Sequence, residues 1–203
     1  MIAQAKGIVL KASRYGEADL IVSLLTTEGA RLQLFARSAL KSKKRFGGGV
    51  LEPTRYIQVS FEDRRSRLGG ESDLHSLREA VLLEAFEGIR NDYSRIETAL
   101  ALVQSVHRIV RQGDVESAEI FNLLGNSLRA IETSNDLAKL RVHFDIRLLA
   151  SQGVLEIEGD SARLAGMPVG HHGCEELTNL DWRGLGQYAT QQLRRYTESG
   201  SVE

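Results

Sequence analysis

The first third of the chain alternates hydrophobic and polar residues as short β-strands do. After an apolar stretch at residues 18–25 and a turn at residues 26–29, residues 31–37 alternate with a period of two. A second alternating run at residues 55–61 places Ile57, Val59 and Phe61 on one face. Short strands separated by turns are typical of a small closed barrel.

From about residue 77 the hydrophobic period becomes helical, and apolar residues recur every three or four positions in four segments. Residues 154–180, between the third and fourth segments, are rich in glycine and acids and are expected to be irregular. Asn135 or Asp136 is expected to cap the third helix, and Gly153 to end it. The pattern predicts an α+β chain with a barrel over residues 1–76 and a helical domain over residues 77–203. The recurring residues of the four segments, in chain order, are Tyr93, Ile96, Leu100, Val103, His107 and Val110; Ala118, Phe121, Leu124, Leu128 and Ile131; Leu137, Leu140, Phe144 and Leu148; and Trp182, Leu185, Ala189, Leu193 and Tyr196.

Composition narrows the class of protein. The 203 residues carry a formal net charge of −1, and no apolar run approaches the roughly 18 residues that a membrane span needs. The first residues show no long apolar segment of the signal-peptide type, and Cys174 is the single cysteine. We therefore expect a cytoplasmic protein with no membrane contact.

The near-neutral total hides a strongly basic segment between residues 31 and 67. This segment holds ten basic residues and three acids, a net charge of +7, so the rest of the chain carries −8. A local field of this size can hold a polyanion. The candidate phosphate-binding residues are Arg31, Arg37, Lys41, Lys43, Lys44, Arg45, Arg64, Arg65 and Arg67.

Two glycine-containing basic loops are expected within this segment. Residues 41–49, KSKKRFGGG, predict a mobile loop, and residues 62–70, EDRRSRLGG, a second one. Phe35 lies among Arg31, Gln33 and Arg37 on one strand face, so it is a candidate for stacking on a base of single-stranded nucleic acid. The alternatives are that Phe35 packs under a loop and that the basic run only increases solubility.

Three stretches of sequence carry a resemblance to a known family. They are Tyr-Gly-Glu-Ala-Asp at residues 15–19, Arg-Phe-Gly-Gly at 45–48 and Leu-Glu-Pro at 51–53, and their order and spacing closely resemble the amino-terminal region of the RecO family. The segment HFDIRLLASQGV, residues 143–154, is similar to that family's Phe-Glu-Leu-Arg-Leu-Leu helix. Residues 187–196 resemble its last helix more weakly.

This resemblance implies a fold and a function. The fold is an oligonucleotide-binding (OB) barrel followed by an α-helical domain. The function is that of a mediator of DNA repair and homologous recombination, associated with the nucleoid. Such a protein binds single- and double-stranded DNA, anneals strands and, with RecR, helps RecA to load on DNA coated by single-strand-binding protein.

The resemblance also implies that the helical domain binds the acidic, apolar tail of single-strand-binding protein. Such a tail needs a cation beside an apolar pocket. Helical spacing brings Arg141, Phe144, Arg147 and Leu148 together, so these residues are the expected partner site. The alternative is that Phe144 and Leu148 are core residues and that both arginines pair with acids.

The chain departs from the family pattern at two places. Many family members carry paired Cys-x-x-Cys motifs for zinc, whereas LEIEGD follows Gly153-Val154 here and only His171, His172 and Cys174 remain nearby. A structural zinc ion needs four ligands, so we expect no metal and no other cofactor. The chain also ends in TESGSVE, where the family often has a basic tail.

Enzymatic readings find little support in the sequence. It contains no GxxxxGK[ST] phosphate loop, no HExxH and no GxSxG, so we expect a protein that is not an enzyme. Two alternatives to a recombination mediator stay open. One is a general OB-fold nucleic-acid binder, and the other is an adaptor protein whose basic loops bind an acidic protein and do not contact DNA.

Overall fold

The computed structural model describes residues 1–63, 74–110, 118–155 and 158–199, which divide into two compact units. The first unit comprises Met1–Phe86 and Val110–Phe121, and the second comprises Glu87–Ile109 and Asn122–Glu203. Helix α3 (Ala118–Thr133) runs from the first unit into the second. Each unit contains its own cluster of buried hydrophobic side chains.

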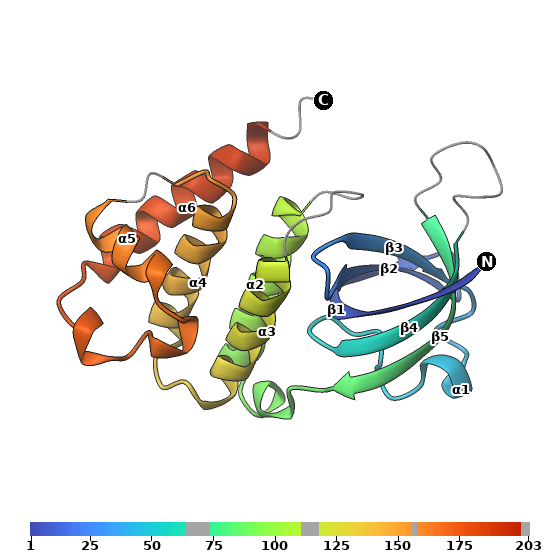
Figure 1. Cartoon of the computed structure of the whole chain (residues 1–203). Coiled ribbons are helices and arrows are strands. Elements are labelled where there is room, and N and C mark those ends of the chain that lie inside the picture. The colour runs from blue at the N-terminus through green and yellow to red at the C-terminus, as the bar shows by residue number, and fades with distance from the viewer. Residues whose placement is uncertain (64–73, 111–117, 156–157, 200–203) are drawn as a thin grey trace. The chain divides into compact units, whose positions relative to one another are not determined.

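The first unit is a five-stranded closed barrel (Figure 1), as the sequence pattern predicts. Its strands follow the order β1-β2-β3-β5-β4, and every neighbouring pair is antiparallel except β3 and β5. A five-stranded closed barrel is the architecture of the OB fold, and a helical region follows it, so the expected α+β class is confirmed. The strands are β1 (Ile2–Tyr15), β2 (Asp19–Thr26), β3 (Arg31–Ala36), β4 (Tyr56–Glu62) and β5 (Leu74–Glu84).

Strand β1 closes the barrel because it is long enough to pair with two neighbours. Its first half pairs with β4 and its second half with β2, with a register shift between Val9 and Lys11. At Gly7 the two ladders meet, and a Cβ atom there would collide with the carbonyl of Leu25. Glycine is therefore required where β1 passes from one partner to the other.

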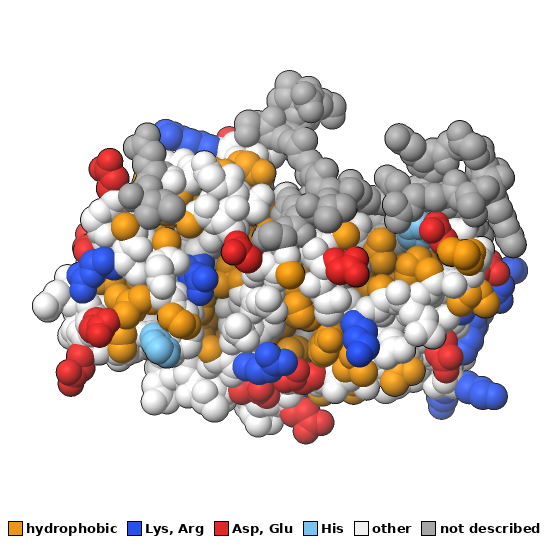
Figure 2. Space-filling model, in the orientation of Figure 1, with side chains coloured by type: hydrophobic (Ala, Val, Ile, Leu, Met, Phe, Trp, Pro, Cys, Tyr) orange, Lys and Arg blue, Asp and Glu red, His pale blue; other side chains and the backbone are white. Residues whose placement is uncertain are grey.

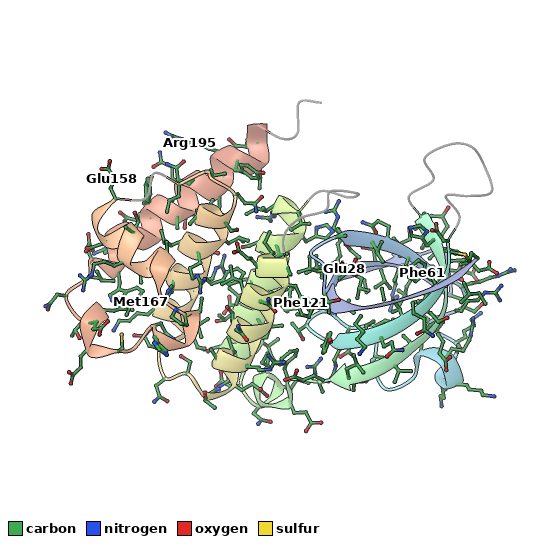
Figure 3. All side chains as sticks on the ribbon, in the orientation of Figure 1. Glu28, Phe61, Phe121, Glu158, Met167 and Arg195 are labelled. Atoms are coloured by element: carbon green, nitrogen blue, oxygen red, sulfur yellow. The ribbon has the colours of Figure 1, made fainter. Side chains whose placement is uncertain are left out.

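The barrel interior is filled by the inward-facing residues of each strand. Ile57, Val59 and Phe61 of β4 are buried, as their alternation predicts, and Phe61 lies among the strands in Figure 3. Leu34 of β3 and Leu77 of β5 are buried in the same cluster. Burial of one such side chain stabilises the fold by roughly 1.5–3 kcal/mol, so the alternation decides which face of each strand lies inward.

The expected change to helix at residue 77 is wrong. Strand β5 continues to Glu84, and the first compact unit reaches Phe86, so the barrel is about ten residues longer than the expected 1–76. Pairing with β4 shifts register between Ser60 and Phe61, so the inward residues Leu77 and Ala80 are three positions apart. That spacing imitates one turn of a helix.

The second unit is helical. Its long helices are α2 (Tyr93–Ile109), the greater part of α3, α4 (Leu137–Ser151) and α6 (Trp182–Ser199), joined by α5 (Gly159–Gly166) and short 3-10 turns. The 3-10 turns are η1 (Glu87–Asn91), η2 (Val169–His171) and η3 (Glu175–Leu177). Ile146 and Leu149 of α4 pack with Leu164, Leu177 and Ala189 from the elements that follow it.

The ends of helix α4 confirm two expectations. The Asp136 side chain accepts a hydrogen bond from the Lys139 amide at 3.0 Å, so Asp136 rather than Asn135 is the N-cap. Gly153, with φ of +64°, follows the helix in the left-handed conformation that ends it.

Two other helical expectations are corrected. Helix α2 forms and buries Val103 as expected, but Tyr93 and Leu100 are 78% and 43% exposed. The other residues of its buried side include Ala99, Leu102 and Val106. The segment expected to be irregular, residues 154–180, contains α5, whose start is held by a reciprocal capping box between Glu158 and Ser161. The helices that the structure describes include none with the length and hydrophobicity of a membrane span.

Candidate nucleic-acid interface

The basic segment after β3 is not the free loop that its glycines predict. Residues 43–46 form a short helical turn, α1 (Lys43–Phe46), and Phe46 is only 7% exposed because it packs into the barrel core. Phe46 thus anchors a segment whose Lys41, Lys43 and Lys44 are exposed to solvent. Figure 2 shows Lys and Arg side chains gathered on the side of the barrel where α1 lies.

Arg45 is the basic residue of this segment that is tied to the barrel. Its guanidinium donates to the carbonyl of Arg37 at 2.9 Å and to the Ser42 hydroxyl at 3.3 Å, and it lies 4.9 Å from the centre of the Phe46 ring. Arg45 therefore holds α1 beside the end of β3. The exposed cations of α1 and the exposed Arg37 thereby belong to one surface.

The turn out of β3 is also fixed. Ser38 has a positive φ of 55°, which is uncommon for a residue with a Cβ atom, and its amide donates to the Asp19 carboxylate at 2.6 Å. The amide of Leu40 donates to the carbonyl of Ala18 at 3.0 Å. These bonds to the start of β2 determine where the basic segment leaves the barrel.

An aromatic pair lies on the outer face of the barrel and includes Phe35, two positions before Arg37 in the sequence. Phe35 is half-buried, and the ring of Tyr15 meets it edge to face, with 5.8 Å between centroids and 87° between planes. Tyr15 is 58% exposed. The alternation of the sequence predicts Phe35 as a stacking residue but not Tyr15, although the exposed position of Tyr15 follows from the turn at Gly16.

Arg31, another predicted DNA contact, lies away from this surface. Arg31 begins β3 and Arg37 follows its end, so along an extended strand their backbones are about 20 Å apart. Arg31 is also partly buried, and desolvation lowers the pKa of its guanidinium. Arg64, Arg65 and Arg67 lie outside the described residues.

Comparison with known proteins identifies the family. The model described as "Recombination protein O N terminal" matches residues 1–86, which coincide with the first segment of the barrel unit, Met1–Phe86. A protein from Desulfosudis oleivorans named "DNA repair protein RecO" is 33% identical over 204 residues, covering 97% of this chain and 76% of that protein. The chain belongs to the RecO family.

Other RecO proteins match shorter parts of the chain. The RecO of Anaeromyxobacter dehalogenans (strain 2CP-1) is 32% identical over 168 residues, which cover 83% of this chain and 63% of that protein. The RecO of Thermodesulfovibrio yellowstonii is 38% identical over 128 residues, covering 63% of this chain and 48% of that protein. The chain therefore spans less than two thirds of the length of some RecO proteins that it matches.

The expected partner site on α4 is not available as a surface. Phe144 and Leu148 are fully buried, so they cannot receive the side chain of a bound peptide. Arg141 donates to Asp145 at 2.7 Å, and Arg147 donates to the carbonyl of Met167 at 3.1 Å. In this RecO-family chain, these four residues contribute to the helical unit itself.

Buried polar groups of α4 join this helix to the segment after it. The Nε2 atom of His143 lies 2.8 Å from the carbonyl oxygen of Leu164 and 3.1 Å from that of Met167, which Figure 3 labels beyond α5. Burial lowers the pKa of His143 to about 4. The side chain is therefore neutral at pH 7, and it links α4 to the end of α5 through hydrogen bonds.

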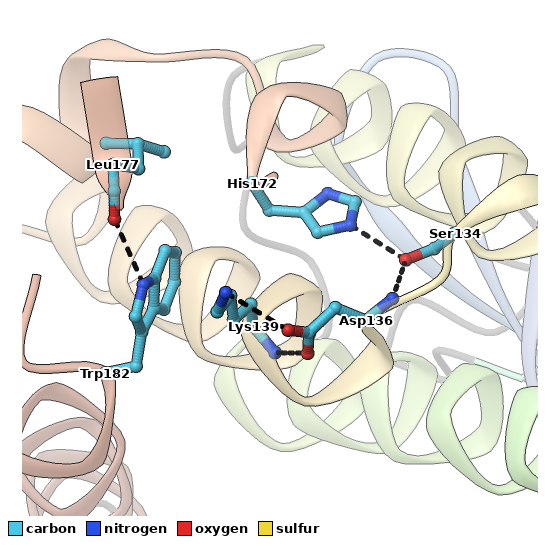
Figure 4. Close-up of polar contacts among 6 residues, drawn as sticks. All are labelled: Ser134, Asp136, Lys139, His172, Leu177 and Trp182. Carbon is cyan, nitrogen blue, oxygen red and sulfur yellow. Dashed lines mark hydrogen bonds and ion pairs between the residues drawn. The ribbon is translucent and has the colours of Figure 1, made fainter. Parts of the chain in front are cut away.

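The residues left near the family's zinc position line a cavity of about 650 Å³. His172 uses both ring nitrogens there: Nε2 lies 2.8 Å from the Ser134 hydroxyl (Figure 4) and Nδ1 lies 2.9 Å from the Val169 carbonyl oxygen. Within the part of the chain that the structure describes, no three His, Cys, Asp or Glu residues are grouped to hold a metal. Among the described residues, His171 and Cys174 therefore lack the partners that a zinc site needs.

Removal of metal ions should leave the stability of this protein unchanged. We expect protein purified without added zinc to contain far less than one zinc per chain, because His172 is engaged in hydrogen bonds and Cys174 is the single cysteine. A chelator should not shift the melting curve, since no folding free energy would come from metal binding. One tightly held zinc per chain would contradict this reading.

Proposed function

We propose that this chain acts in DNA repair and recombination by binding DNA through the α1 side of its barrel. The observation that carries the proposal is the anchoring of α1 by Phe46 and Arg45, which holds exposed cations at the end of the strand that carries Phe35, the ring partner of Tyr15. Single-stranded nucleic acid requires these two kinds of group, cations for phosphates and flat rings for bases. Membership of the RecO family supports the same reading.

The proposed action is mechanical and electrostatic rather than catalytic. The lysines of α1 would neutralise phosphates and so reduce the repulsion between two strands held close together. Double-stranded DNA would be held through its phosphates by the same lysines. Annealing of complementary strands follows from this arrangement, and no bond is made or broken by the protein.

The proposal includes the specific proteins with which a recombination mediator would interact. They are single-strand-binding protein and its carboxy-terminal tail, RecR, and RecA as the protein that is finally loaded. Because α4 uses Phe144 and Leu148 internally, the tail would have to bind elsewhere on the protein.

An annealing assay on DNA coated with single-strand-binding protein tests the mediator role. We expect the protein to accelerate pairing of complementary oligonucleotides when they are bare and also when they are coated. Acceleration of bare strands alone would favour a general OB-fold binder. Failure to bind any DNA in a salt-dependent mobility shift would favour the adaptor reading and would contradict the proposal.

A further inference from the structure

The tip of the first hairpin carries an exposed aromatic residue that the barrel does not need for its core. Tyr15 is the last residue of β1 and is 58% exposed, whereas the core side chains of the same unit are almost fully buried. Burying so little of a large ring contributes little to the stability of the barrel. An aromatic side chain that stabilises the fold only slightly is free to serve a ligand.

The position of Tyr15 is nevertheless well determined. Its backbone pairs with Asp19 across the hairpin, and Gly16, with φ of +64°, makes the tight turn between the two strands. The ring is held on one side by its edge-to-face contact with Phe35. A ring held in this way loses little conformational entropy when a planar ligand stacks on it.

The surroundings of this ring match one kind of ligand. The exposed Arg37 lies two positions beyond Phe35, just past the end of β3, and Arg45 joins the Arg37 carbonyl to the cations of α1. Cations beside an exposed ring suit a polyanion whose bases are unpaired, because a duplex keeps its base faces stacked inside. Glu17 and Asp19 lie on the same hairpin, but Asp19 is engaged by the Ser38 amide.

We propose that Tyr15 is the base-stacking residue of the interface and that it selects single-stranded nucleic acid over duplex. Phe35 is a positioning residue that holds the Tyr15 ring. The inference rests on the proposed function, namely that the α1 side of the barrel binds nucleic acid, and it adds the side chain that reads unpaired bases.

The test compares three DNA ligands by fluorescence anisotropy: an oligothymidylate of about 16 nucleotides, the upper site size of one OB barrel, an abasic strand of equal length, and a duplex. We expect Tyr15→Ala to weaken oligothymidylate binding by about 5- to 150-fold, the equivalent of roughly 1–3 kcal/mol per stacked base. Binding of the abasic strand and of the duplex should change by less than about threefold, because phosphate contacts remain.

Three further variants sharpen the result. Tyr15→Phe keeps the ring and should bind like the wild type. Tyr93→Ala removes an even more exposed tyrosine, in the helical unit, and should also bind like the wild type. Phe35→Ala should weaken oligothymidylate binding while sparing the abasic strand. Added to Tyr15→Ala, it should cause little further loss, because a positioning residue acts only through the ring that it holds.

The outcomes separate this inference from the proposed function. If the wild type binds oligothymidylate and Tyr15→Ala binds it equally well, the inference is overturned while DNA binding stands. If Tyr15→Ala loses all three ligands together and melts at a lower temperature, Tyr15 is structural and the inference also fails. If the wild type binds none of the DNA ligands, the proposed function itself fails.

Discussion

Replacing Lys41, Lys43, Lys44 and Arg45 together with alanine should weaken binding to all DNA sequences alike. Each phosphate contact to a single strand contributes about 0.7 to the slope of log K against log salt, so losing four flattens the slope by up to about 3. The affinity should fall by roughly two to three orders of magnitude at 50 mM salt, and by much less near 1 M. Titrations at several salt concentrations measure both quantities.

The structure adds a distinction among these four residues. Arg45 also holds α1 to the carbonyl of Arg37, so its replacement can act by displacing the lysines as well as by removing a charge. A variant with the three lysines replaced should therefore retain the fold of α1 and still lose most of the salt dependence. Arg45→Ala alone should weaken binding by more than any single lysine replacement.

A matched control removes three positive charges from the helical unit. Arg183, Arg194 and Arg195 are exposed on α6, and replacing them changes the net charge by the same amount as replacing the three lysines. We expect this control to bind DNA with nearly the wild-type slope. Equal losses in the two triple variants would mean that net charge, rather than the α1 surface, governs affinity.

Arg141→Ala should be among the most destabilising single substitutions in the helical unit. Asp145 has a side chain only 7% exposed, and Arg141 is its ion-pair partner. Breaking a buried pair by removing one partner costs about 3–5 kcal/mol. Because the Arg141 side chain is 35% exposed and thus screened by water, we expect a smaller loss, about 2–4 kcal/mol.

The loss should depend on pH in a defined direction. Burial raises the pKa of Asp145, and Arg141 opposes that rise, so removing Arg141 raises this pKa further. A carboxyl group with a raised folded-state pKa binds its proton more readily in the folded protein than in the unfolded chain. The loss in free energy of unfolding caused by Arg141→Ala should therefore become smaller as the pH falls through the folded-state pKa of Asp145.

Denaturant unfolding followed by tryptophan fluorescence measures this loss of stability in the helical unit of the protein. Trp182 is the single tryptophan and belongs to the helical unit, where its indole donates to the Leu177 carbonyl. Lys139→Ala breaks an exposed ion pair on the same helix and should cost less than about 1 kcal/mol. An Arg141→Ala variant as stable as the wild type at pH 7 would show that Asp145 does not need its partner.

This prediction also affects any search for a partner site on α4. A variant lacking Arg141 and Arg147 would lose a bound peptide simply because the helical unit is weakened. Sequence spacing could not reveal this, since Arg141, Phe144 and Leu148 follow the same three- and four-residue pattern on a buried helix as on an exposed one. Only the packing of Leu164, Leu177 and Ala189 against α4 shows that the helix is covered on several sides.

The sequence by itself determined the features that depend on neighbouring residues. Strict alternation at Ile57, Val59 and Phe61 identified the inward face of β4. The start of α4 was located to Asn135 or Asp136, and its end to Gly153. These features could be predicted because strand faces and helix caps are set by contacts within a few residues along the chain.

The tertiary structure alone decided what depends on distant residues. Strand β5 is recognised through its pairing with β4, and α1 becomes a fixed surface because Phe46 enters a core built by other strands. The Tyr15–Phe35 pair joins residues twenty positions apart. Burial and ring contacts of this kind arise only when the barrel closes, since closure brings together side chains that no local pattern relates.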